Sequence, residues 1–186
     1  MSLPDDLPDE LLGFVERADA AGLAERVSTL GRRRTLAVRD EIVRRGRHAE
    51  LVDVLLEGLH DPRARVRYDC AEALDHLADG RCADPLREAL RDPVPRVRRA
   101  AIHSLSCDAC KVVSLEAETD VVALVVAHAL DDPSIRVRRE AATALGGLHD
   151  RRAVAALEEL VGRESDVTLV RNARWSLRRQ AHAAAS

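Results

Sequence analysis

Apolar residues recur along this chain at helical spacing, and one short motif stands before three of these recurrences. The motif is Asp-Pro, three residues and then Val-Arg, at 61–67, 92–98 and 132–138. After each Val, small or apolar residues follow at the fourth and eighth positions, namely Cys70 and Leu74, Ala101 and Leu105, Ala141 and Leu145. This spacing places them on one face of a helix. Asp as an N-cap and Pro at the first helical position predict that each motif begins that helix.

The segments between the motifs are apolar at helical spacing too, so the pattern predicts helices in pairs. The first helices of the pairs are expected over 49–59, 85–90, 119–130 and 153–161, and the second over 63–77, 94–105, 134–148 and around 169–177. Val-Arg dipeptides begin at residues 38, 66, 97, 137 and 170. A two-helix unit that returns after roughly 30 residues indicates a solenoid. We interpret the copy at Val38, which lacks Asp-Pro, as a degenerate first unit, and the copy at Val170 as a C-terminal cap.

These units resemble HEAT repeats of the short bacterial type, also called HEAT-like or phycobilin-lyase-type repeats. The resemblance rests on Asp-Pro-x-x-x-Val-Arg-x-x-Ala-x-x-x-Leu and covers about residues 34–180. It implies an all-α protein, a right-handed α-α superhelix with about four to five helical hairpins. We expect a lead-in with capping helices over residues 1–33 and the repeat array over 34–182. This scaffold carries enzymes, nucleic-acid binders and adaptors, so the fold alone does not identify the function.

Composition narrows the classes of partner. The 186 residues are 33% charged with a net charge of −3, which is not the basic balance that favours non-specific nucleic-acid binding. Lys111 is the only lysine among 29 Lys and Arg residues, a bias that suggests a high-GC genome, and we expect a high-GC bacterium. No apolar stretch approaches the roughly 20 residues of a membrane span, so we expect a cytoplasmic protein with no membrane partner.

The arginines separate into two groups by their position in the repeat. An Arg follows each Val, at positions 39, 67, 98, 138 and 171. A residue that every unit carries is expected to join unit to unit, so we interpret these arginines as a ladder that pairs with carboxylates or helix-end carbonyls. Function is expected where the units differ.

The variable positions lie on the second helix of each unit, which lines the concave side in proteins of the HEAT-like fold. The face away from the apolar stripe carries Arg65, Tyr68, Glu72, Arg96, Arg99, His103, Arg136, Arg139, Thr143, Asn172 and Ser176. We take Arg65, Tyr68, Arg96, Arg99, His103, Arg136 and Arg139 as the candidate binding residues for a protein partner that is acidic. The alternatives are a solvated face, and a nucleic-acid binder or HEAT-like DNA-repair protein. Tyr68 and Trp175 are its only aromatic residues for stacking.

An insertion in the array carries a further candidate site. The step from Leu105 to Val126 is longer than the equivalent step from Leu74 to Leu86, and it contains Cys107-x-x-Cys110. Two thiolates at this spacing can bind a zinc ion that needs four ligands. Cys82 is the expected third ligand, with His76 or His103 as the fourth. The alternatives are a thiol sensor and thiols that are merely structural. Cys70, in the apolar stripe, is expected to be a buried small hydrophobe.

Enzyme signatures are absent from the sequence. It contains no Gly-rich phosphate loop, no His-Glu-x-x-His and no Gly-x-Ser-x-Gly. We therefore expect a non-enzymatic scaffold that binds a protein partner and has no cofactor. The two alternatives are the nucleic-acid binder and a zinc clip or thiol sensor built on Cys107 and Cys110.

Overall fold

The computed structural model describes residues 6–107 and 120–184, and within these residues the chain is helical and has no β-strand. The α-helices are α1 (Leu7–Glu16), α2 (Ala20–Ser28), α3 (Arg32–Arg44), α4 (His48–Gly58), α5 (Ala64–Leu77), α6 (Ala83–Ala89), α7 (Pro95–Ser106), α8 (Val121–Asp131), α9 (Ile135–Ala144), α10 (Arg151–Arg163) and α11 (Val167–Ala184). A 3-10 helix, η1 (Gly80–Cys82), precedes α6. The prediction of an all-α fold is confirmed.

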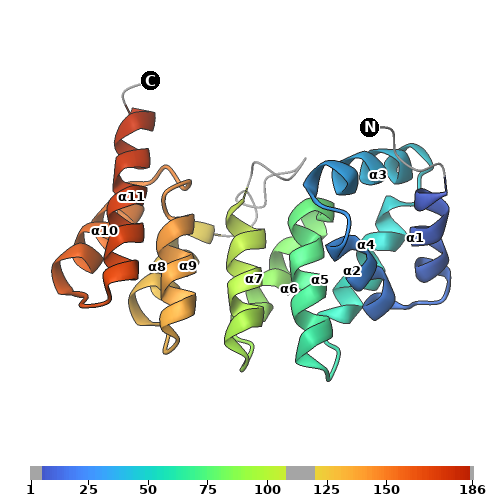
Figure 1. Ribbon diagram of the computed structural model, residues 1–186, viewed down its shortest axis with the longest axis horizontal. Helices are drawn as coiled ribbons and strands as arrows, with labels where there is room; N and C mark the ends of the chain where they lie inside the picture. Colours follow the sequence, from blue (N-terminus) through green and yellow to red (C-terminus); the bar gives the residue numbers. More distant parts are fainter. Residues whose placement is uncertain (1–5, 108–119, 185–186) are drawn as a thin grey trace.

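The helices form hairpins that follow one another along the long axis of the molecule (Figure 1). The pairs α4–α5, α6–α7, α8–α9 and α10–α11 each form one hairpin. The second helices, α5, α7, α9 and α11, pack extensively against one another in turn, whereas the first helices contact their neighbours less. The second helices are therefore more closely spaced and form the concave side of the stack. We call these four helices the inner row and their exposed surface the inner face.

The N-terminal region differs from the sequence interpretation. The helix that packs most extensively against α5 on its N-terminal side is α2, and α1 contacts both α2 and α4. The first hairpin is therefore α1–α2, and α3, which carries Val38 and Arg39, is an additional helix and not a degenerate repeat copy. Gly31 and Gly46, with φ of 68° and 69°, stand at its two ends, where the chain needs a backbone conformation that glycine adopts without strain. The domain boundary at residue 33 stays a prediction.

The Asp-Pro pairs lie just before the helices that they were expected to cap. The helices begin at Ala64, Pro95 and Ile135, each two residues after the Pro that was predicted to be the first helical residue. Each Asp instead forms a turn with its own chain, because its Oδ1 accepts a hydrogen bond from the N–H two residues on, at 2.7 to 2.8 Å. The Asp-Pro motif therefore shapes the connection inside the hairpin. The predicted N-cap role is wrong.

The apolar stripe forms the core as predicted, with one change of register. Val66, Cys70 and Leu74 and their counterparts in α7 and α9 are buried, including Cys70 as the expected small hydrophobe. In α11 the buried apolar residues are Leu169 and Ala173, whereas Val170 is half-buried. Leu169 therefore occupies the Val position. The predicted copy at Val170 was one residue out of register, and this places Val170 where the other units have Arg.

An arginine ladder of Arg67, Arg98 and Arg138 joins the units, as predicted for these three residues. Each guanidinium donates to the backbone carbonyl of the Asp in its own motif, at 2.8 to 3.1 Å. Each also reaches an acid before the next second helix, in the pairs Arg67–Asp92 at 2.6 Å, Arg98–Asp132 at 2.8 Å and Arg138–Glu164 at 3.5 Å. Glu164 stands five residues before Leu169, as each Asp stands five before its Val. Arg39 donates to the His76 carbonyl in the last turn of α5, at 3.3 Å, which is a helix-end contact of the predicted kind. Arg171 lies outside this ladder.

None of the described helices combines enough residues with enough apolar character to cross a bilayer.

Candidate functional site

In three successive units, the inner face presents an arginine at the position before the Val. Arg65, Arg96 and Arg136 occupy this position in α5, α7 and α9, and all three are exposed. Arg65 forms an ion pair with Asp69 on its own helix. The guanidinium carbon of Arg96 lies 5.5 Å from the centre of the Tyr68 ring, a cation–π contact between neighbouring units. We call these three arginines the arginine row.

The next position along the inner face carries arginines that are already neutralised. Arg99 of α7 lies 3.6 Å from Glu140 of α9, and Arg139 of α9 lies 2.6 Å from Asp166 before α11. Hydrogen bonds from Arg139 and from the N–H of Leu169 lower the pKa of Asp166 to about 2. Among the described residues, these two arginines therefore join units through ion pairs, whereas the arginine row does not.

A charge network occupies the middle of the inner face, between α5, α7 and α9. His103 Nε2 lies 3.5 Å from Asp75 Oδ2, and His103 Nδ1 lies 3.5 Å from Glu140 Oε1. Hydrogen bonding to Asp75 and then to Glu140 raises the pKa of His103 to about 10, so the ring is an imidazolium at neutral pH. The bond from His103 in turn lowers the pKa of Glu140. Negative and positive charges therefore alternate in the order Asp75, His103, Glu140 and Arg99.

A pocket of about 260 Å³ opens beside this network, between α2 and α3 on one side and α5 and α7 on the other. Asp75, His76 and His103 line it together with Arg32, Glu72 and smaller side chains. His76 Nδ1 lies 3.0 Å from Asp75 Oδ2, so two histidines face one buried carboxylate. Within the described residues, His76 Nε2 is buried without a hydrogen-bond partner. The pocket therefore has a polar end formed by Asp75 and both histidines.

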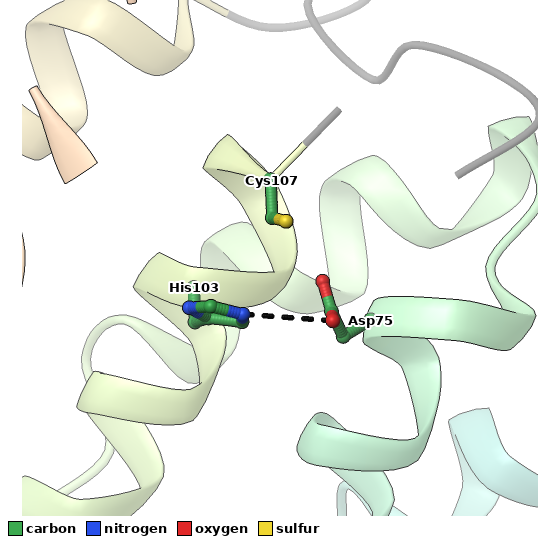
Figure 2. Close-up of side chains that lie close together, drawn as sticks. All are labelled: Asp75, His103 and Cys107. Atoms are coloured by element: carbon green, nitrogen blue, oxygen red, sulfur yellow. Dashed lines mark ion pairs between the residues drawn. The ribbon is translucent and has the colours of Figure 1, made fainter. Parts of the chain in front are cut away.

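Of the thiols predicted as zinc ligands, Cys82 and Cys107 do not belong to one ligand group within the described residues. Cys82 is fully buried, and its Sγ lies 3.9 Å from Asp79 Oδ1. Cys107 belongs instead to a group with Asp75 and His103, whose ligand atoms all lie within 4.8 Å of one another (Figure 2). Cys110 lies outside the described residues. Within the described part of the chain, the group around Cys107 and His103 contains Asp75 in place of the predicted ligand Cys82.

A comparison with protein families gives the fold its name. The model for HEAT repeats matches residues 52–111 and 107–178, which together make up more than half of the chain. The chain belongs to the HEAT-repeat family. No curated protein matched it. HEAT repeats typically mediate binding to other proteins, and the matched residues include the whole of the inner row from α5 to α9.

Within this HEAT array, the predicted binding residues share the inner face but fall into different environments. The face also differs from prediction near its C-terminal end, because the register shift in α11 buries Ser176 completely and exposes Trp175. Ser176 donates a hydrogen bond of 2.7 Å to the Ala142 carbonyl, as Ser104 does to the Ala71 carbonyl at 2.6 Å. These hydroxyls hold one HEAT unit to the next.

Sequence reasoning missed Asp75 as a member of the site. Asp75 stands three residues after Glu72 and seven after Tyr68, which is the spacing of one helical face, so the helical pattern could have placed it there. Its proximity to Cys107 could not be read from the sequence, because that contact depends on how far α7 is displaced along α5.

Proposed function

We propose that this HEAT-repeat chain is a non-enzymatic scaffold that binds a protein partner through the inner face. The observation that carries the proposal is the arginine row. Arg65, Arg96 and Arg136 recur at one repeat position, are exposed, and take no part in the ladder that holds the units together. An array of this kind offers cations at regular intervals to an extended segment of another protein.

The chemistry of the row favours carboxylates on that partner. A guanidinium binds a carboxylate through two parallel hydrogen bonds, and Arg96 is already held in place by the Tyr68 ring. Neighbouring acids neutralise Arg99 and Arg139, and Asp69 neutralises Arg65, so among the described residues Arg96 and Arg136 contribute the charge that is still available. We therefore propose a partner segment with acidic residues spaced to match successive HEAT units.

The test is charge reversal of the row against a matched control. The double variant Arg96→Glu/Arg136→Glu is compared with Arg87→Glu/Arg163→Glu, which changes the net charge equally but lies on α6 and α10, first helices of their hairpins. Proteins captured by the wild-type chain from native extract are quantified by mass spectrometry for all three baits. We expect the row variant to lose the specific partner by at least tenfold and the control to keep it. Equal capture by both variants would show that the row is not the binding site.

A nucleic-acid partner is tested with the same proteins. Duplex and single-stranded DNA are titrated at low salt, where electrostatic binding is strongest. We expect no shift in electrophoretic mobility. Binding that weakens with salt and is lost in the row variant would assign the inner face to nucleic acid instead.

A further inference from the structure

We propose that Asp75, His103 and Cys107 bind a divalent transition-metal ion of the zinc type. One carboxylate, one imidazole and one thiol place their ligand atoms within 4.8 Å of one another. Zinc holds ligands at about 2.0 to 2.3 Å, so small side-chain rotations bring all three onto one ion. Figure 2 shows Cys107 one turn beyond His103 on α7, with Asp75 facing them from α5.

The ligand set selects the class of metal. Thiolate and imidazole favour zinc and its neighbours in the first transition series, whereas magnesium and calcium require oxygen ligands. A carboxylate and a thiolate together carry two negative charges, which balance the two positive charges of a divalent ion. Three protein ligands leave the fourth tetrahedral position for a water molecule, and the adjoining pocket provides the space for it.

The helices hold the ligands before any metal binds. His103 and Cys107 are four residues apart, which places them on the same face of α7 one turn apart. Cys107 is the C-cap of α7, where the helix dipole favours a cation. Asp75 is only 3% exposed, and its helix α5 packs extensively against α7. The side chain of His103 is 53% exposed, so an ion can reach the site from solvent.

Glu140 supplies the support that histidine ligands usually have. A metal-binding histidine coordinates through one ring nitrogen and donates the other N–H to a carboxylate or carbonyl. His103 turns Nε2 toward Asp75 and Nδ1 toward Glu140, and Arg99 holds Glu140 from its other side. A metal ion on Nε2 would displace the Nε2 proton to solvent and leave the Nδ1–H to Glu140 in place. A surface ion pair between His103 and Asp75 would not by itself require Glu140 at the second ring nitrogen.

The other described thiols are poor ligands by comparison. Burial raises the pKa of Cys70 and of Cys82 to about 12, so both remain thiols at neutral pH. Neither is in the group that converges on His103. They therefore serve as internal controls for the site.

The experiment titrates the full-length, chelator-treated chain with Co²⁺, and then displaces it with Zn²⁺. A thiolate ligand gives Co²⁺ a charge-transfer absorption band, which neither an ion pair nor a carboxylate site produces. We expect this band in the wild type and its loss in Cys107→Ser. We expect His103→Gln and Asp75→Asn to weaken Co²⁺ binding at least tenfold. Glu140→Gln should weaken it by about 10- to 100-fold, as for other outer partners of histidine ligands.

Matched controls separate this site from the thiol clip that the sequence suggested. Cys82→Ala and Cys110→Ala should keep the band and the affinity, as should Arg96→Glu/Arg136→Glu, and circular dichroism confirms that each variant is folded. Absence of Co²⁺ binding to the wild type would overturn the proposal. So would a band that survives His103→Gln and Asp75→Asn but disappears in Cys110→Ala.

Discussion

Arg98 and Arg99 are adjacent in the chain, yet they have different roles because a helix turns them to different surroundings. Arg98 is 8% exposed and shares two hydrogen bonds of 2.8 Å with Asp132 of the next unit. Arg99 is half-buried on the inner face and lies 3.6 Å from Glu140. Almost no water reaches the buried Arg98–Asp132 pair to replace a lost partner. Removal of Arg98 is therefore expected to cost more folding free energy than removal of Arg99.

The first prediction concerns this buried pair. We expect Arg98→Met to lower the free energy of unfolding by about 3 to 5 kcal/mol, because Asp132 would keep a buried charge without its guanidinium. Arg96→Met, at an exposed position of the same helix, should change it by less than about 0.5 kcal/mol. Urea unfolding followed by circular dichroism measures both. Similar values for the two variants would mean that the ladder does not stabilise the stack.

At the scale of the element, helix ends are placed by their neighbours as much as by their own sequence. Gly146 lies just beyond α9, where a Cβ would meet the Ser176 Oγ at 2.7 Å and its Cα at 3.0 Å. Ser176 is fully buried and bonds the Ala142 carbonyl from this position. The close approach of α9 and α11 therefore depends on a residue without a side chain.

A pair of glycine variants tests this contact. We expect Gly146→Ala to destabilise the protein by about 1 to 3 kcal/mol, because α11 must move away or Ser176 must lose its bond. Gly162→Ala, inside α10 with open space around it, should stabilise the protein by about 0.5 to 1 kcal/mol through helix propensity. Thermal melting of both variants gives the comparison. Stabilisation by both would refute the close packing of α9 and α11.

At the scale of the whole molecule, the arginine ladder runs through the array. It makes the stability of the folded chain depend on pH in the acid range. Burial raises the pKa of Asp132, but hydrogen bonds from Arg98, the Ser134 N–H and His128 outweigh it, so its pKa lies below the ordinary value. The pKa of Asp92 is lowered in the same way, since bonds from Arg67 and the Val94 N–H exceed the effect of burial. Both carboxylates are therefore more acidic in the folded chain than in the unfolded one.

The sign of the pH dependence follows from these lowered pKa values. Their contribution is complete above the unfolded Asp pKa of about 3.9 and is lost as the pH falls through the lower folded values. We expect the free energy of unfolding to drop between about pH 5 and pH 2. The drop should be smaller in Asp92→Asn/Asp132→Asn, which cannot titrate at these positions. An equal drop in both proteins would assign the acid sensitivity to other groups.

The repeat pattern predicted much of the fold but less of the site. Helical spacing and internal repetition predicted the hairpins and the buried stripe, because these depend on contacts that recur in every unit. The ladder was predicted for the same reason at Arg67, Arg98 and Arg138. The N-cap error recurred in all three Asp-Pro motifs, whereas the errors of register and pairing fell where one unit departs from the rule. In α11, Leu169 occupies the position of the repeat Val, one residue earlier than predicted. At the N-terminal end, the helix that packs most extensively against α5 is α2, where α3 was expected.

What the sequence determined by itself was therefore the solenoid and most of the residues on its inner face, with Asp75 missed and Ser176 misplaced. A period of two helices leaves few ways to bury one apolar stripe per helix. The tertiary structure alone decided which arginines are neutralised and which thiol meets Asp75 and His103. These relations join residues of neighbouring units, and they depend on the displacement of one helix along the next, for which a helical repeat carries no local signal.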